Sequence, residues 1–279
     1  MELKALLDRA LTLADEGEWE RMAELLVEHL AEHEKEPAVH CWLGVAEREL
    51  GLEGVAYERF RRALALSPED PYVLATAGNG VAAFDDLDAE QALRTAALLA
   101  PDVALTRYLY GAYLSREGFV PDGLRELQAA RELDADDPQI AYELGVARYL
   151  AGNLEGALDA VGESVSLDPH DAWPRVVLGL MLLESDRFDE AAGELSEGAH
   201  LHPDDVEAQL AAALAAGATG AEDLAYEMLE RARMRADHED AATILVVEDR
   251  LDSGPEAARA LLMEELAPDM MRRRLQVRP

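Results

Sequence analysis

Apolar positions along this chain recur at the spacing of short amphipathic helices. In the segment 138–171, Ile140 and Leu144 mark one apolar face, and Leu158 and Val161 mark a second one after a Gly-Asn turn. Steps of three and four residues match the period of an α-helix, while Gly and Asn tolerate the positive φ that a tight turn needs. The segment therefore predicts two helices joined by a turn.

The same pattern repeats along most of the chain. Small residues recur in one column and turn residues in another, with steps of 34 residues and a single step of 33. The first column is Ala10, Gly44, Gly78, Gly111, Gly145, Gly179 and Ala213, and the second is Gly17, Gly51, Asp85, Gly118, Gly152, Asp186, Gly220 and Gly254. A fixed period of this length is typical of stacked helical hairpins. We expect the first column, with Ala157 opposite Gly145, to lie where paired helices cross, because only short side chains allow that approach.

One unit carries a recognisable signature. Its segments Tyr142-Glu143-Leu144-Gly145, Gly152-Asn153-Leu154-Glu155-Gly156-Ala157 and Leu167-Asp168-Pro169 resemble the tetratricopeptide repeat. The resemblance implies an all-α fold, a right-handed α-solenoid superhelix of about eight helical hairpins. The array spans 3–266, with units at about 3–36, 37–70, 71–103, 104–137, 138–171, 172–205, 206–239 and 240–266, and a basic C-terminal tail follows at 267–279. Glu47 and Arg148 stand where the family usually has a bulky apolar residue, and we expect both to be partly exposed because an unpaired buried charge is costly.

In this family the first helix of each unit lines the concave surface. The resemblance therefore implies a partner-binding groove at Tyr72, Asn79, Leu105, Tyr108, Arg116, Tyr142, Val146, Tyr149, Trp173, Val176, Leu180 and Leu183. These residues are largely apolar or aromatic in a chain with 30% charged residues. We expect a scaffold or adaptor that binds an apolar or amphipathic peptide segment of a partner protein. The alternative is that winding of the units buries the same residues against their neighbours.

The net charge of the chain limits the kinds of molecule that we expect it to bind. The formal net charge is −33, which repels duplex nucleic acid and anionic membrane surfaces and favours a protein partner with basic flanks. Among the 25 basic residues only Lys4 and Lys35 are lysines, a composition that resembles proteins of salt-loving organisms and that a GC-rich genome also produces. The single cysteine, the absence of a signal-peptide pattern and the lack of a long apolar run lead us to expect a cytoplasmic protein.

The tail differs from the repeats. Residues 267–279 carry four arginines and one acidic residue, with Met270, Met271, Leu275 and Val277 among them. Three interpretations stay open: a disordered end, a segment that docks on an acidic surface of its own or a neighbouring chain, and a segment that binds another anion. The second interpretation gives the alternative function of a self-associating assembly protein whose tail docks in its own or a neighbour's groove, and docking on a neighbour would form a homo-oligomer through the tail.

Few residues in the sequence suggest a metal site or a catalytic site. His29, His33, His40 and Cys41 lie close together in sequence and have side chains that suit Zn or Cu, although their spacing matches no zinc finger. The alternative is a set of surface histidines beside a buried free cysteine. The chain has no phosphate-binding glycine loop, GxSxG turn or Cys-x-x-Cys pair. We therefore expect a protein that is not an enzyme and needs no cofactor.

Overall fold

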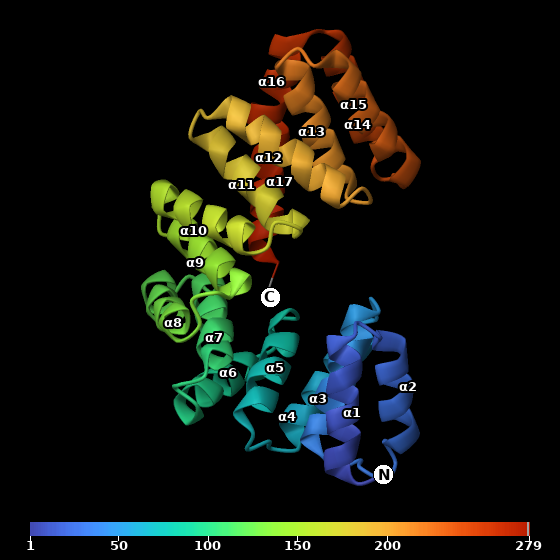
Figure 1. The fold of residues 1–279 in the computed structure, drawn as a ribbon, viewed down its shortest axis with the longest axis vertical. Coiled ribbons are helices and arrows are strands. Elements are labelled where there is room, and N and C mark those ends of the chain that lie inside the picture. Colours follow the sequence, from blue (N-terminus) through green and yellow to red (C-terminus); the bar gives the residue numbers. More distant parts are fainter. Residues whose placement is uncertain (278) are drawn as a thin grey trace. The chain divides into compact units, whose positions relative to one another are not determined.

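The structure is a computed structural model that describes residues 1–277 and residue 279 (Figure 1). Those residues form α-helices and one π-helical segment, with no β-strand among them. Their contacts divide the chain into two compact units, Met1–Asp134 and Ala135–Val277. The predicted all-α class is confirmed, and each unit is described by itself below.

The N-terminal unit consists of four helical hairpins. Its helices are α1 (Leu3–Asp15), α2 (Trp19–His29), α3 (Pro37–Glu49), α4 (Glu53–Ala65), α5 (Pro71–Ala82), α6 (Asp88–Leu99), α7 (Ala104–Arg116) and α8 (Val120–Leu133). Each odd-numbered helix packs on the helix that follows it. The first helices of successive hairpins, α1, α3, α5 and α7, also contact one another in that order and form a continuous inner layer.

The C-terminal unit continues the pattern and then departs from it. Its helices are α9 (Pro138–Leu150), α10 (Leu154–Leu167), α11 (Ala172–Glu184), α12 (Phe188–Leu201), α13 (Val206–Ala218), α14 (Glu222–Arg235), α15 (Ala241–Asp252), α16 (Pro255–Leu261), the π-helical segment η1 (Leu262–Leu266) and α17 (Ala267–Gln276). The last helix, drawn in red in Figure 1, runs back through the unit and contacts α11.

The predicted turn column lies at the bend inside each hairpin. All eight of its residues have positive φ, between 53° and 104°, and six of them are glycines. Asp85 and Asp186 adopt the same conformation at φ values of 53° and 59°. Asp tolerates this left-handed region better than most residues, although less well than Gly. The column therefore marks the turns, as the sequence predicts.

The small column lies where paired helices cross. A Cβ atom added to Gly145 on α9 would lie 2.5 Å from Cγ2 of Val161 and 3.2 Å from the carbonyl oxygen of Ala157, both on α10. A methyl group at 2.5 Å from Val161 would force a shift, so glycine allows α9 and α10 to pack at this separation. The predicted role of Gly145 and Ala157 at the helix crossing is confirmed.

Aspartates fix the starts of several first helices. Asp70, Asp137, Asp171 and Asp205 precede α5, α9, α11 and α13, and each accepts a hydrogen bond from a backbone N–H in the first turn of its helix. These N–H groups have no partner within the helix, so such a cap stabilises the helix by about 1 kcal/mol. The repeated caps start the first helix of these units at the same place in the repeat.

Glu47 and Arg148, which stand where the family usually has a bulky apolar residue, differ in their exposure. Glu47 is buried, with 7% of its surface exposed, so the expected partial exposure is wrong for this residue. Both of its carboxylate oxygens accept from Nε of Arg59 at 3.3 Å, and this pairing offsets the cost of burial. Arg148 is half-buried, as expected, and its Nη1 donates to the carbonyl oxygen of Gly156 at 3.0 Å.

Candidate functional site

The predicted groove residues of the N-terminal unit differ in accessibility. Tyr72 is exposed at the start of α5, and Leu105 is half-buried at the start of α7. Asn79 and Tyr108 are buried, and Arg116 is half-buried at the end of α7. This part of the predicted set therefore presents isolated side chains and no continuous exposed apolar surface.

The C-terminal unit holds the remaining seven predicted residues. We call them the inner stripe; its members are Tyr142, Val146 and Tyr149 on α9, and Trp173, Val176, Leu180 and Leu183 on α11. Five of the seven are buried, whereas Tyr149 and Trp173 keep part of their surface exposed. The stripe thus belongs to the core of the unit, with two aromatic side chains reaching its surface.

Two side-chain hydrogen bonds join α9 to α11, near opposite ends of the helices. The indole Nε1 of Trp173 donates to the hydroxyl oxygen of Tyr142 at 2.9 Å, and the hydroxyl of Tyr149 donates to a carboxylate oxygen of Glu184 at 2.7 Å. Burial, followed by the hydrogen bond to Glu184, raises the pKa of Tyr149 to about 12. Because these contacts link neighbouring repeats, they hold the aromatic side chains of the stripe in place.

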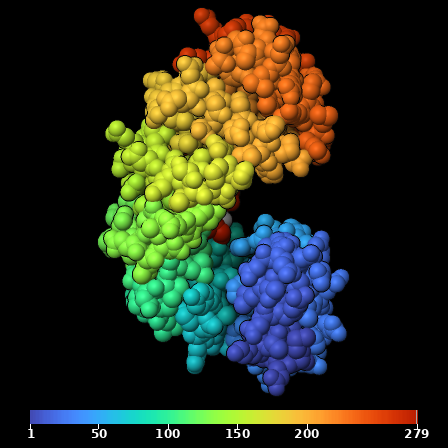
Figure 2. All heavy atoms as spheres, in the orientation of Figure 1, coloured from blue at the N-terminus to red at the C-terminus, as the bar shows by residue number. Residues whose placement is uncertain are grey.

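The α11 part of the inner stripe contacts α17 of the same unit. Met270, Met271, Arg274 and Leu275 of α17 are buried. The three apolar members belong to the same hydrophobic cluster as the stripe. From the side drawn in Figure 2, other helices of this unit hide most of α17. The stripe therefore contacts an amphipathic helix of its own chain.

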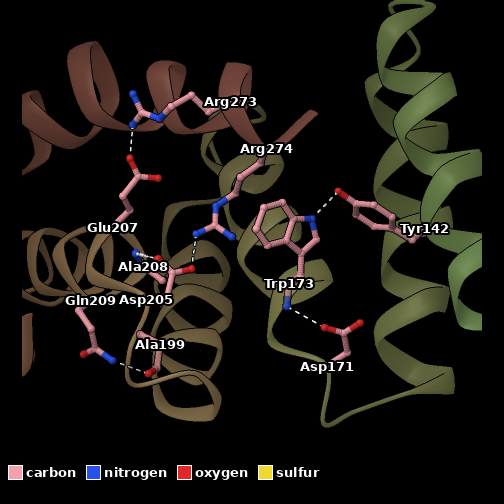
Figure 3. Close-up of polar contacts among 10 residues, drawn as sticks. All are labelled: Tyr142, Asp171, Trp173, Ala199, Asp205, Glu207, Ala208, Gln209, Arg273 and Arg274. Atoms are coloured by element: carbon pink, nitrogen blue, oxygen red, sulfur yellow. Dashed lines mark hydrogen bonds and ion pairs between the residues drawn. The ribbon is translucent and has the colours of Figure 1, made fainter. Parts of the chain in front are cut away.

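Arg274 is the polar centre of this contact. Its guanidinium carbon lies 4.4 Å from the centre of the Trp173 ring, and its Nη2 donates to Asp205, the residue that caps α13 (Figure 3). Only 3% of the surface of Arg274 is exposed. Nε and Nη1 have no hydrogen-bond partner among the residues that the structure describes. Next to it, Arg273 pairs with Glu207 at the surface.

The sequence alone did not single out Asp205, Glu207 or Arg274 as partners of the stripe. Asp205 stands at the end of the predicted unit 172–205, and nothing in the sequence around it marks it as a partner of the stripe. The signal in the tail was clearer, since Met270, Met271, Arg274 and Leu275 lie on one face of a helix. The spacing of these residues does not show on which surface that face packs.

The four candidate metal ligands make separate contacts. Nδ1 of His29 lies 3.4 Å from Glu32, whereas His33 and His40 each contact a backbone carbonyl oxygen, those of Met1 and Glu34. Cys41 is buried, and burial raises the pKa of its thiol well above the ordinary range. Across the described part of the chain, no three His, Cys, Asp or Glu side chains are grouped closely enough to hold a metal ion.

Within residues 1–277 and 279, none of the helices combines the length and the apolar character that crossing a bilayer requires.

Comparison with known proteins gives structural matches alone. No family profile matches the sequence, and no curated protein sequence matches it. The Cut9–Hcn1 hetero-tetramer of the APC/C matches with a TM-score of 0.72 and 18% identity over 90% of this chain and 49% of that chain. This chain therefore spans about half the length of that match.

Two further matches are PilF and MamA. PilF of Pseudomonas aeruginosa has a TM-score of 0.60 and 14% identity over 76% of this chain and 96% of that chain. MamA has a TM-score of 0.50 and 22% identity over 60% of this chain and 96% of that chain. These proteins consist of tetratricopeptide repeats. Together with the repeat geometry described above, the matches establish that the chain has the fold of tetratricopeptide-repeat proteins.

Proposed function

We propose that this protein is an interaction scaffold that binds an apolar or amphipathic segment of a partner protein at the inner stripe of its C-terminal unit. One observation carries the proposal: an amphipathic helix, α17, already packs against the first helix of a repeat there. A surface that buries apolar side chains of a helix and pairs its arginine has the chemistry of a helix-binding site.

The side chains at the edge of the stripe support a protein partner. Tyr149 and Trp173 are large, stiff and amphipathic, and such residues contribute strongly to binding free energy at protein interfaces. Glu184, Asp205 and Glu207 border them with negative charge. The proposed partner segment therefore carries basic residues beside its apolar ones, which speeds encounter with an acidic surface.

Affinity capture of partners with the 279-residue chain tests the proposal. Tyr149→Ala removes a partly exposed aromatic side chain from the stripe, and Asp159→Ala changes an exposed position on α10 as the matched control. We expect Tyr149→Ala to weaken capture of a given partner at least about tenfold, corresponding to about 1.4 kcal/mol, and Asp159→Ala to leave it unchanged. Equal capture by both variants would contradict binding at the stripe.

A second candidate function is self-assembly, in which α17 of one copy packs on the stripe of another. The favouring observation is that α17 buries its apolar face on a surface present in every copy. Exchange of identical elements between copies is a low-cost route to dimers. Light scattering over a wide range of protein concentration tests it: self-assembly predicts a mass that rises toward the dimer, and a constant monomer mass contradicts it.

A further inference from the structure

We infer that α17 is a built-in substitute for the partner, so that the surface beneath it accepts, in its place, a partner helix with apolar side chains and one arginine on a single face. This inference rests on the proposed function and names the chemistry of the ligand. It also makes α17 a competitor that lowers the affinity of the site until it is displaced.

The buried face of α17 defines the sequence pattern of such a ligand. Met270, Met271, Arg274 and Leu275 are buried, whereas Arg272, Arg273 and Gln276 between and after them are exposed. Positions i, i+1, i+4 and i+5 form one stripe on a helix. A partner helix presents the same face when it has Met or Leu at positions i, i+1 and i+5 and Arg at position i+4.

The receiving surface selects arginine over lysine. The guanidinium group of Arg274 stacks on Trp173 while its Nη2 donates to Asp205, so the site uses a planar cation with several donors (Figure 3). A lysine ammonium is a compact and strongly hydrated charge that cannot stack in this way. Asp205 is held in position by its hydrogen bond from the backbone N–H of Ala208 at 2.9 Å, so the acceptor is preorganised.

Two features make α17 displaceable. The π-helical segment η1 joins it to α16, and such π-helical turns within α-helices are frequently found at functional sites. In addition, Nε and Nη1 of the buried Arg274 lack hydrogen-bond partners among the described residues, which costs binding free energy. A partner helix that also carries an acceptor for the corresponding N–H groups of its own arginine, such as an Asn or Ser side chain, avoids this cost and outcompetes α17.

Binding of a synthetic peptide with the sequence of residues 266–277 to the full-length protein tests the inference. Arg274→Ala in the protein weakens the internal competitor and raises the fraction of sites that are open, and the apparent affinity rises with that fraction. We expect this variant to bind the fluorescently labelled peptide at least about tenfold more tightly than the wild-type protein does. A protein with Arg272→Ala is the control, because Arg272 is exposed and pairs with Asp269 on its own helix.

A second peptide tests the preference for arginine, and amide hydrogen exchange provides a second measurement of displacement. The peptide with Arg274→Lys is expected to bind the Arg274→Ala protein several-fold more weakly than the wild-type peptide. If the Arg274→Ala protein lacks a cooperative thermal transition, amide hydrogen exchange on the wild-type protein decides the question. Peptide at about millimolar concentration, comparable to the effective concentration of a tethered segment, should then speed exchange at 270–275. Unchanged exchange, or equal binding by the Arg274→Ala and Arg272→Ala proteins, overturns the inference.

The outcomes separate this inference from the proposed function. If Tyr149→Ala abolishes capture of a partner but the peptide neither binds nor competes, the stripe still binds partners and the ligand chemistry assigned here is wrong. If capture is insensitive to Tyr149→Ala, the proposed function itself fails. A mass that doubles in Arg274→Ala without peptide binding would assign the surface to a second copy of this chain and overturn the inference.

Discussion

The guanidinium carbon of Arg274 lies 4.4 Å from the centre of the Trp173 indole ring. The same guanidinium donates to Asp205, so one side chain of α17 connects the first turn of α11 with the cap of α13. Two consecutive repeats are thereby joined to a helix that follows them by many residues in sequence. Whether a partner can reach the inner stripe therefore depends on how stable the packing of α17 is and on whether a partner helix can displace α17.

The first prediction concerns the stability of the C-terminal unit. Arg274→Ala removes the stack on Trp173 and the ion pair with Asp205, and we expect it to lower the free energy of unfolding by about 2 kcal/mol. Urea unfolding followed by the fluorescence of Trp173, with Trp19 and Trp42 changed to Phe, measures this unit. Arg272→Ala is the control and should change stability by less than about 0.5 kcal/mol, since its partner is also exposed.

Asp205→Asn completes a double-mutant cycle with Arg274→Ala. Asn caps helices as well as Asp does, so this change removes the charge while keeping the cap on α13. A coupling free energy of about 1 kcal/mol or more between the two positions is expected for a direct, largely buried pair. Strict additivity of the two changes would show that Arg274 and Asp205 do not interact in solution.

The second prediction uses two glycines of the same hairpin. Gly145→Ala places a methyl group 2.5 Å from Val161 and should destabilise the unit by about 1–3 kcal/mol. Gly162→Ala, within α10, meets no atom within 4 Å and should stabilise the helix by up to about 1 kcal/mol. Opposite signs in thermal or urea unfolding support the helix crossing at Gly145; equal effects would mean that the helices are not in close contact there.

The third prediction concerns alkaline pH. The pKa of Tyr149 is about 12, above the ordinary value of about 10, so the folded state favours the neutral phenol. The stabilisation this gives is complete below about pH 10 and is lost as pH rises toward 12. Tyr149→Phe should therefore be less stable than wild type at pH 8, with the difference shrinking above pH 10. A difference that stays constant through pH 12 would exclude the hydrogen bond to Glu184.

The fourth prediction concerns salt. A net charge of −33 on 279 residues produces strong repulsion among carboxylates in the compact state. Because added salt shortens the Debye length to about 3 Å at 1 M, we expect the melting temperature to rise between about 0.05 M and 1 M NaCl. A melting temperature that falls over this range would mean that attractive ion pairs outweigh the repulsion.

The regular spacing of small residues and turn residues predicted the parts of the fold that depend on local sequence. Turn residues need positive φ, and helix crossings need small side chains, so both kinds of position leave a trace in the residue types themselves. Gly152 and Gly145 illustrate the two cases. The residues of the stripe on α9 and α11 came instead from the resemblance to the repeat family, and their binding role stays a proposal.

The remaining features depend on contacts between residues distant in sequence. Glu47 was expected to be partly exposed, but Arg59 on the next helix pairs with it and allows burial. The neighbours of Arg274 could not be predicted from the sequence either. An amphipathic pattern shows that one face of a helix will be buried, but it does not show which residues cover that face. Only the packed structure brings α17 to Trp173 and Asp205.

Photo-crosslinking from the inner stripe tests the central claim most directly. A benzoylphenylalanine at position 149 replaces one partly exposed aromatic side chain by another, and the same group at position 159 on α10 provides the control. Binding at the stripe predicts that a captured partner becomes attached from position 149 and not from position 159. Attachment from position 159 alone, or equally from both positions, would contradict it.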